Sequence, residues 1–423
     1  MPSPAPSSEQ ARTDFVVVER CRGCGSDALV DFLDLGELPL PDALVATADL
    51  DGPEARFPMD VTFCRECSLV QIRQDVSPEA LFVENNLYFS SFSAGLLKHC
   101  REHALNLIQT RGLGAGSLVV EIASNDGYML KNFVEHGIPA LGIEPGPPQA
   151  AAAIAEGVPT RQEFFDADCA RRLVAEGKRA DVIIANNVMA HTPTLNSFAE
   201  GLSILLAEDG VATIENTYVK DLIDHCEFDT IYHEHFCYFS CTAVDALMRR
   251  HGLFLNAVEH FPTLQGGTLR WIIGAREDVQ ESARGFLAAE REQGLTSFEY
   301  YERFGERVTG IRKGLRELLA GLRAEGKSIV GYGAAAKAST LLNFTGVDGE
   351  FIDYVVDRNV HKHGKHMPGI HQPIHPVEKL LEDQPDYVLL LAWNYRDEVM
   401  RQQAEYLERG GRFIIPVPEP QIL

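Results

Sequence analysis

The segment FDTIYHEHFCYFS, residues 228–240, gathers side chains suited to proton chemistry. Tyr232, His233, Glu234 and His235 follow one another, flanked by aromatic and aliphatic residues. An imidazole with a pKa of about 6.5 exchanges protons near neutral pH, so an acid–base site is one interpretation. Two others stay open from these residues alone. The histidines could bind a metal, although they lack His-Glu-x-x-His spacing, or the group could be a hydrogen-bonded polar cluster in the core.

Four of the nine cysteines form two Cys-x-x-Cys pairs, Cys21/Cys24 and Cys64/Cys67. Each pair presents two thiolates to one cation, and two pairs make the tetrahedral S₄ set of a structural zinc ion. All four ligand positions are then filled by protein, which leaves no open position for catalysis. The other cysteines have no ligand spacing and are expected to be small buried apolar residues. They are Cys100, Cys169, Cys226, Cys237 and Cys241.

From about residue 118 the chain alternates apolar strands with helices, which is typical of a doubly wound parallel sheet. Ligands of such sheets lie at the carboxyl ends of the strands. The first turn, EIASNDG, has one glycine and two acids, unlike the Gly-x-Gly-x-x-Gly of dinucleotide sites. Carboxylates repel a pyrophosphate but suit the sulfonium, ammonium and ribose groups of S-adenosylmethionine; an NAD-type fold is the alternative. The predicted cofactor residues are Glu121, Asn125, Gly127, Glu144 and Asn187.

A second, smaller α/β unit begins near residue 300, where KSIVGYGAAAKASTLLNF reads as strand, Gly-rich turn and helix. Small residues at a helix N-terminus with a nearby lysine favour phosphate binding. Basic residues cluster again between positions 358 and 365 in a chain that is otherwise acidic. A solvated loop on a structural domain is the alternative interpretation of this region.

The chain has 423 residues and a formal net charge of −23, which argues against nucleic acid or an anionic membrane as the main partner. It lacks an apolar run long enough to span a bilayer. The polar, Pro/Ser-rich N-terminus has no signal core, so we expect a cytoplasmic protein. A monomer suffices for three packed domains. The expected divisions are a disordered tail (1–18), a zinc-binding domain (19–85), a catalytic S-adenosylmethionine domain (86–299) and a nucleotide-sugar-binding α/β domain (300–423).

The motifs occur in an order that resembles one enzyme family. Two Cys-x-x-Cys pairs come first, followed by E-I-A-S-N-D-G, N-N-V-x-A-H, Y-H-E-H-F, G-G-x-L-R, G-Y-G-A-x-A-K and A-W-N. This order is similar to that of the sugar C-methyltransferases of actinomycete deoxysugar pathways, over nearly the whole chain. The resemblance implies an α/β protein with an N-terminal four-cysteine zinc domain, a central Rossmann-like S-adenosylmethionine methyltransferase domain and a C-terminal second Rossmann-like domain.

The resemblance also implies a reaction. The family acts on dTDP-linked 4-keto-deoxysugars of glycosylated natural products such as antibiotics, and methylates the carbon next to the ketone, most often C-3 and sometimes C-5. His235 matches the family's proposed base; Tyr232 and Glu234 would orient it or contact the sugar, and His191 would stabilise the enolate. The expected nucleotide-sugar contacts are Lys337, Asn343, Lys362, Trp393 and Asn394.

Two positions depart from the family pattern. Asn86 replaces the first tyrosine of a Tyr-x-Tyr-Phe-Ser-Ser segment, in which the candidate catalytic Tyr88 remains, and Gln265 replaces a histidine before Gly-Gly. Amides do not titrate, so these two changes leave open which sugar carbon is methylated and how the enolate is stabilised. A second hypothesis is therefore a 4-ketoreductase, alone or combined with the methyltransferase, that uses NADPH with Tyr88 or His191 as acid. A third, a non-enzymatic zinc scaffold, fits poorly with so many intact motifs.

Overall fold

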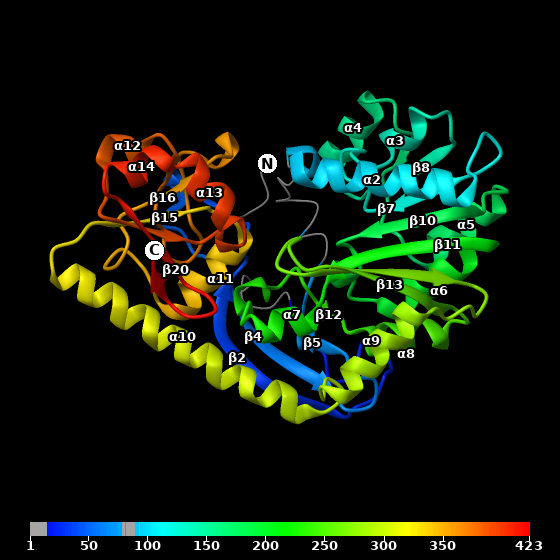
Figure 1. Ribbon diagram of the computed structural model, residues 1–423, viewed down its shortest axis with the longest axis horizontal. Helices are drawn as coiled ribbons and strands as arrows, with labels where there is room; N and C mark the ends of the chain where they lie inside the picture. The colour runs from blue at the N-terminus through cyan, green and yellow to red at the C-terminus, as the bar shows by residue number, and fades with distance from the viewer. Residues whose placement is uncertain (1–14, 78–80, 82–88, 93) are drawn as a thin grey trace, which may run out of the picture.

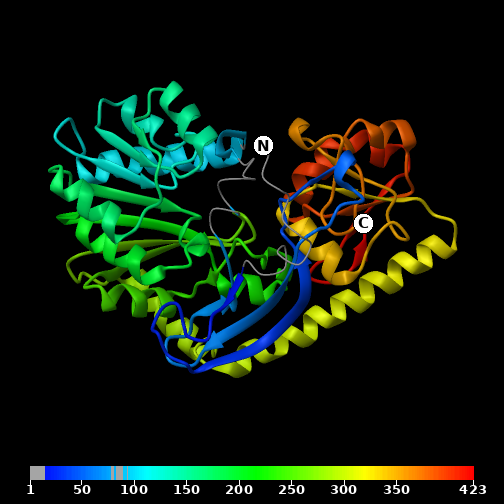
Figure 2. The same ribbon diagram turned by 180° about the vertical axis from the view of Figure 1, so that it is seen from behind.

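Two α/β lobes are joined by an N-terminal antiparallel sheet and one long helix (Figure 1). The computed structural model describes residues 15–77, 81, 89–92 and 94–423. The first lobe holds the middle of the sequence and the second its C-terminal part, and the N-terminal strands lie between and below them. The view from behind shows the same arrangement (Figure 2). The predicted fold class, with its zinc domain and two α/β domains, is confirmed.

The N-terminal sheet has the strand order β12-β5-β4-β2, so it takes its edge strand from residues 228–240, the predicted catalytic segment, far along the chain. Its strands are Leu29–Pro39 (β2), Arg56–Cys64 (β4), Val70–Ile72 (β5) and Cys237–Tyr238 (β12). Phe15–Val17 (β1) pairs with Gln74–Val76 (β6). Residues 15–17 were expected in a disordered tail. Their side chains, one aromatic and two β-branched, instead favour a strand, which pairs with β6.

The central domain contains a seven-stranded sheet of order β13-β14-β11-β10-β7-β8-β9. Strands β7, β8, β9, β10 and β11 are parallel to one another, whereas β14 and β13 are antiparallel to their neighbours. All residues of β7 and β8 are buried, as expected for parallel strands covered on both faces. The strands are Val119–Ile122 (β7), Ala140–Ile143 (β8), Thr160–Arg161 (β9), Ala180–Asn186 (β10), Leu206–Thr217 (β11), Phe254–Phe261 (β13) and Thr268–Gly274 (β14).

Helices cover this sheet and carry residues of the site. They are Ala94–Arg111 (α2), Lys131–Val134 (α3), Pro147–Ala155 (α4), Ala167–Ala175 (α5), Leu195–Leu205 (α6), Val219–Asp224 (α7), Cys241–Arg250 (α8) and Glu281–Glu292 (α9). Short 3₁₀ turns span Ser90–Phe92 (η3), Met189–His191 (η4) and Phe228–Thr230 (η5). The Ser240 side chain caps α8 by accepting a hydrogen bond from the Ala243 N–H at 3.0 Å, so the catalytic segment ends where this helix begins.

The C-terminal domain has a six-stranded sheet of order β18-β16-β15-β19-β20-β21. Its strands are Ile329–Tyr332 (β15), Val355–Asp357 (β16), Ile374–Pro376 (β18), Tyr387–Leu390 (β19), Arg412–Ile415 (β20) and Gln421–Ile422 (β21). Its helices and turns are Ala336–Thr345 (α11), Val360–Lys362 (η6), Lys379–Asp383 (α12), Trp393–Tyr395 (η7), Arg396–Gln402 (α13) and Ala404–Glu408 (α14). A further strand, Lys365–His366 (β17), pairs with Val45–Ala46 (β3) of the N-terminal region.

Helix Phe298–Ala324 (α10) connects the two lobes along the lower edge of Figure 1. The predicted domain division between residues 299 and 300 falls in its first turn, and the division between 85 and 86 lies outside the described residues. In the described part of the chain, none of the helices is long and apolar enough to cross a bilayer.

Candidate active site

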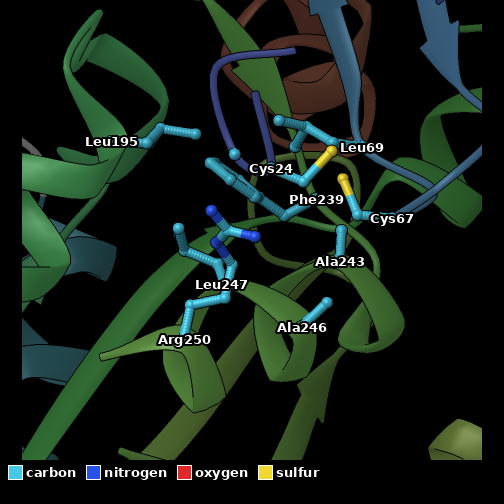
Figure 3. Close-up of a pocket in the computed structure, with 10 residues that line it drawn as sticks. Cys24, Cys67, Leu69, Leu195, Phe239, Ala243, Ala246, Leu247 and Arg250 are labelled. Carbon is cyan, nitrogen blue, oxygen red and sulfur yellow. The ribbon is translucent and has the colours of Figure 1, made fainter. Parts of the chain in front are cut away.

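The four predicted zinc ligands lie together. The Sγ atoms of Cys21 and Cys67 are 3.5 Å apart, as are those of Cys24 and Cys64, and all four lie within 4.8 Å of one another. These separations suit four thiolates around one ion with Zn–S bonds of about 2.3 Å. Figure 3 shows Cys24 and Cys67 beside Phe239 and side chains of α6 and α8. The zinc module is therefore packed against the central domain, and the five other cysteines are buried as predicted.

The acidic turn after β7 meets the end of β8. Glu144 accepts hydrogen bonds from the N–H groups of Asn125 at 2.9 Å and Gly146 at 2.8 Å. Gly127 has φ +78°, and a Cβ there would lie 2.9 Å from Val158, so this turn requires glycine. Glu121 ends up buried behind the turn, where desolvation and then the charge of Glu144 raise its pKa well above the usual value.

This edge of the sheet fits S-adenosylmethionine. Asn186 is 9% exposed, and neither its side-chain oxygen nor its nitrogen has a hydrogen-bond partner among the described residues. Asn187 follows with φ +54° and donates its N–H to the Glu215 carbonyl at 2.7 Å. Buried amide atoms and carboxylates at one edge match a ligand with hydroxyl, amine and sulfonium groups. The roles predicted for Glu144 at the ribose hydroxyls and for the Asn186–Asn187 pair at the amino-acid moiety stay predictions.

The catalytic segment is held by the N-terminal sheet and the central domain together. Phe236 accepts a hydrogen bond at its carbonyl from the Ile72 N–H at 3.0 Å and donates its own N–H to the Ala190 carbonyl at 2.8 Å. The guanidinium of Arg22, from the first zinc knuckle, lies 5.1 Å from the centre of the Phe236 ring. The residue directly after His235 is thus fixed to both the zinc module and η4.

Three predicted catalytic residues meet in space. The ring centres of His191 and His235 are 4.7 Å apart, and those of Tyr232 and His235 are 4.1 Å apart. The His235 Nδ1–H donates to the Thr230 carbonyl at 2.9 Å, and the His191 Nδ1–H donates to the Glu234 carbonyl at 2.7 Å. A carbonyl can only accept, so in both neutral rings Nε2 carries the lone pair. His235 is therefore oriented as a base through Nε2.

Burial keeps both imidazoles neutral. Desolvation lowers the pKa of His235 well below its usual value, and the neighbouring His191 lowers it further. Desolvation likewise lowers the pKa of His191 to about 4. A histidine whose pKa is lowered is unprotonated above that pKa, so at neutral pH each ring is in the form that can accept a proton.

The two remaining members of the segment have other surroundings. His233 is fully buried; its Nε2–H donates to the Pro58 carbonyl at 3.1 Å and its ring packs against Phe57. It is the hydrogen-bonded core residue that the sequence left open. Burial, with the nearby Asp42, raises the pKa of Glu234 well above its usual value, while Lys362 opposes this shift. Within the described ranges, the four cysteines form the single group suited to a metal.

Three of the predicted substrate residues form one cluster beside this segment. Lys337 Nζ donates to Asn394 Oδ1 at 2.8 Å and lies 4.6 Å from the centre of the Trp393 ring. Trp393 Nε1–H donates to Asp229 Oδ2 at 2.7 Å, which joins the C-terminal domain to η5. Asp229 is fully buried, and desolvation raises its pKa to about 6 although Lys337 opposes the shift.

The other two predicted substrate residues are bonded to backbone carbonyls. Lys362 donates to the Ala334 carbonyl at 2.6 Å, next to the Gly-rich turn. Asn343 donates to the carbonyls of Ser339 at 2.9 Å and Pro368 at 3.0 Å, and accepts from Arg56 at 3.4 Å. Its amide therefore joins the C-terminal domain to the N-terminal region, and its substrate role stays a prediction. Tyr88 and Asn86 lie outside the described residues.

Comparison with known proteins decides the family. Three family models match successive parts of the chain: a zinc binding domain over residues 21–82, a methyltransferase domain over 97–258 and a C-methyltransferase C-terminal domain over 263–418. C-methyltransferase NovU of Streptomyces niveus is 36% identical over 409 residues, which cover 96% of this chain and 97% of NovU. The chain belongs to this C-methyltransferase family. It is an S-adenosylmethionine-dependent C-methyltransferase, as the order of motifs predicted.

Two solved structures align with less than half of this chain. Magnesium protoporphyrin IX methyltransferase from Synechocystis PCC 6803, with bound SAM, is 12% identical and aligns with 42% of this chain and 79% of its own, with a TM-score of 0.33. The PH0226 protein from Pyrococcus horikoshii OT3 is 15% identical and aligns with 45% of this chain and 95% of its own, with a TM-score of 0.35. At this level of similarity they add nothing to the family assignment.

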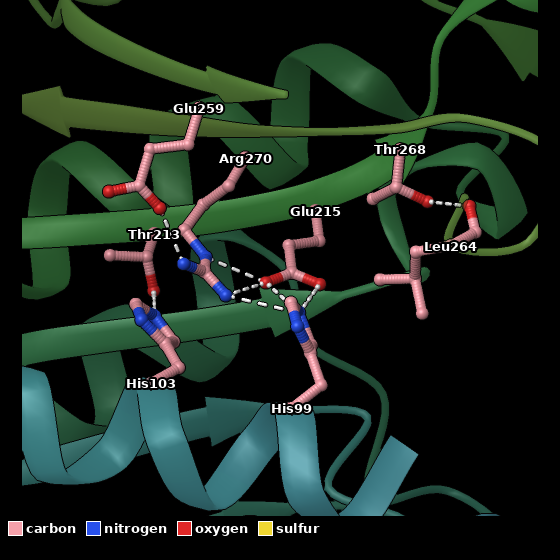
Figure 4. A network of polar contacts seen from close by, with 8 residues as sticks. All are labelled: His99, His103, Thr213, Glu215, Glu259, Leu264, Thr268 and Arg270. Carbon is pink, nitrogen blue, oxygen red and sulfur yellow. Dashed lines mark hydrogen bonds and ion pairs between the residues drawn. The ribbon is translucent and has the colours of Figure 1, made fainter. Parts of the chain in front are cut away.

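Helix α2 of the C-methyltransferase is tied to the sheet by a buried ion network (Figure 4). Glu215 accepts hydrogen bonds from Arg270 Nε at 2.7 Å and His99 Nε2 at 3.1 Å, and it is 1% exposed. Desolvation alone would raise the pKa of Glu215, but the His99 hydrogen bond and the Arg270 charge outweigh it and lower the pKa. Since Asn187 donates to the Glu215 backbone, the network also supports the cofactor edge.

We expect Glu215→Gln to destabilise the C-methyltransferase by about 3 kcal/mol, because Arg270 loses its buried acid and keeps only the ion pair with the half-exposed Glu259. Urea unfolding would measure the loss. The double variant Glu215→Gln/Arg270→Met should lose less than the sum of the single variants. Arg276→Met, which removes an exposed ion pair with Glu208, is the control and should unfold like the parent. A loss below about 1 kcal/mol for Glu215→Gln would show that the network contributes little to stability.

Several contacts in the site had not been expected from the sequence. Asp229 and Trp393 are 164 positions apart, and nothing in either motif marks them as partners. Arg22 stands between two zinc ligands, which drew attention to the thiols and not to its contact with Phe236. The acid at position 215 lies near the end of a strand, like Glu121 and Glu144, and that signal could have indicated it.

Proposed function

We propose that this C-methyltransferase methylates C-3, a carbon next to the ketone, of a dTDP-linked 4-keto-deoxysugar. The observation that carries the proposal is the Nδ1 hydrogen bond of His235 to Thr230, which presents Nε2 as a base in a buried site. A C–H next to a ketone is acidic enough for such a base when the enolate is stabilised. The motif order resembles that of enzymes for these sugars.

The charges around the site favour an anionic substrate. The chain has a net charge of −23, yet its C-terminal domain directs Lys337 and Lys362 toward the catalytic segment. The Gly-rich turn after β15 precedes both lysines in sequence, and Lys362 is bonded to its Ala334 carbonyl. The Lys362 ammonium, beside small residues before the start of α11, suits a nucleotide diphosphate.

In this mechanism the residues of the chain prepare a carbon nucleophile. His235 Nε2 takes the proton, Tyr232 fixes the plane of the imidazole by lying against it, and the Thr230 carbonyl stabilises the imidazolium through Nδ1–H. S-adenosylmethionine supplies an electrophilic methyl group, whose bonding electrons stay on sulfur. The proton on His235 then returns to solvent. The sugar carbon is itself the nucleophile, so no protein nucleophile is needed.

Incubation with dTDP-4-keto-2,6-dideoxyglucose and S-adenosylmethionine in deuterated water tests the substrate. We expect one added methyl group at C-3, located by NMR and mass spectrometry. Deuterium uptake at C-3 without methylation would support the base but not this sugar as the full substrate. Neither exchange nor methylation would contradict the proposal. A parallel arm with NADPH tests the reductase hypothesis, which predicts loss of the ketone and oxidation of the cofactor.

A further inference from the structure

A base alone does not explain enolate formation at this site. When a C–H bond next to a ketone is broken, the electron pair moves onto the ketone oxygen, which needs a positive or N–H group nearby. His191 was the expected donor, but its Nδ1–H is bonded to the Glu234 carbonyl. Its pKa of about 4 keeps Nε2 unprotonated at neutral pH, so this ring offers an acceptor there. The stabilising charge has to come from another residue.

Helix α11 places Lys337 near the segment that contains His235. Thr340 of this helix donates to the Ile231 carbonyl at 3.4 Å, and Phe344 packs against Phe228 with ring centres 5.2 Å apart. The helix thus lies along residues 228–231, the start of the segment 228–240 that carries His235. Lys337 stands one turn before Thr340, at the start of the helix, and its charge acts on the His235 imidazole.

The Lys337 ammonium is held but not neutralised by a direct ion pair. Its hydrogen-bond partner is the neutral Asn394, and the Trp393 ring lies beside it. The nearest acids act at a longer range: Asp229 is bonded to Trp393, and Glu227 is 2% exposed. Burial lowers the pKa of Lys337, while Asp229 opposes the shift and favours the charged form. Burial raises the pKa of Glu227 to about 9, so this acid is neutral near pH 7. A cation arranged in this way keeps donor capacity for an incoming oxygen.

We propose that Lys337 is a further catalytic residue, whose ammonium donates a hydrogen bond to the enolate oxygen of the substrate. This inference rests on the proposed function and replaces a role in diphosphate binding for this lysine. As the C–H proton moves to His235 Nε2, the C–H electron pair forms the carbon–carbon double bond. The carbonyl π pair moves to oxygen and becomes the enolate charge that Lys337 faces. The C-terminal domain thereby supplies a catalytic group as well as binding contacts.

The test compares full-length wild type with Lys337→Met and Lys337→Arg. Deuterium exchange at the carbon next to the ketone should fall about 100- to 1,000-fold in Lys337→Met at saturating sugar. Affinity for dTDP, measured by calorimetry, should change less than about threefold, and Lys337→Arg should recover part of the exchange because it keeps the charge.

Lys379→Met is the matched control, because Lys379 also lies over an aromatic ring of the C-terminal domain, 5.2 Å from the centre of Tyr354, but pairs with Asp383. Its exchange should equal that of wild type. Exchange by Lys337→Met at the wild-type rate, with a large loss of dTDP affinity, would overturn the proposal and assign Lys337 to the diphosphate. Failure of wild type itself to exchange would instead contradict the proposed function.

Discussion

Replacing His235 with asparagine should reduce deuterium exchange and methyl transfer about 100- to 10,000-fold, the range that general bases contribute. The asparagine amide could still donate toward the Thr230 carbonyl, but it has no basic lone pair in place of Nε2. Both rates should fall together, because methyl transfer needs the carbanion that exchange reports. Single-turnover methylation and NMR of the sugar in deuterated water measure the two rates on the same sample.

His233→Asn is the control for this variant, since His233 lies two positions away and uses Nε2 for a backbone hydrogen bond to Pro58. Its exchange rate per folded molecule should stay close to that of wild type, although its stability will fall. If His235→Asn kept exchange within about tenfold of wild type, His235 would not be the base. His191, whose Nε2 also carries a lone pair, would then take that role.

The sequence predicted the parts of the site that depend on local patterns. Cys-x-x-Cys spacing is a property of short loops, so the four zinc ligands could be named before the fold was known. Glu121 and Glu144 lie at the ends of neighbouring parallel strands, and parallel strands bring their carboxyl ends to one edge. Alternating strands and helices likewise indicated both α/β sheets, because their period is set by local burial.

Contacts between domains were beyond such patterns. Strand β12 completes the N-terminal sheet although its residues Cys237 and Tyr238 are far along the chain from their partners in β5, Gln71 and Val70. Pairing of this kind depends on the packing of whole domains, which leaves no periodic signal. The same holds for Asn343, whose amide meets Pro368 and Arg56 in the folded chain. Predicted lists of polar residues therefore mix ligand contacts with contacts between domains.

The zinc module is expected to be as necessary for activity as the base, although it contains no catalytic group. Structural zinc contributes about 10–16 kcal/mol in small zinc-finger peptides, which matches or exceeds the 5–15 kcal/mol or so that stabilises a typical domain. Here the first knuckle places Arg22 against Phe236, and β5 pairs with β12, which begins directly after the same residue. Loss of the ion should therefore release the segment that carries His235.

We expect the double variant Cys24→Ala/Cys64→Ala to lose its zinc, measured by metal analysis, and at least about 100-fold of methyl transfer, comparable to loss of the base. Cys24 and Cys64 lie 3.5 Å apart, so this change removes two adjoining ligands of the set. Cys169→Ala is the matched control, because Cys169 is fully buried in α5, away from the cluster, and should keep both zinc and activity. S-adenosylmethionine binding should persist in the double variant, since the cofactor edge belongs to the central sheet and is held by Glu144 and the Glu215 network. A zinc-free variant that methylates at the wild-type rate would show that the hydrogen bonds of Phe236 to Ile72 and Ala190 hold His235 in place without the ion.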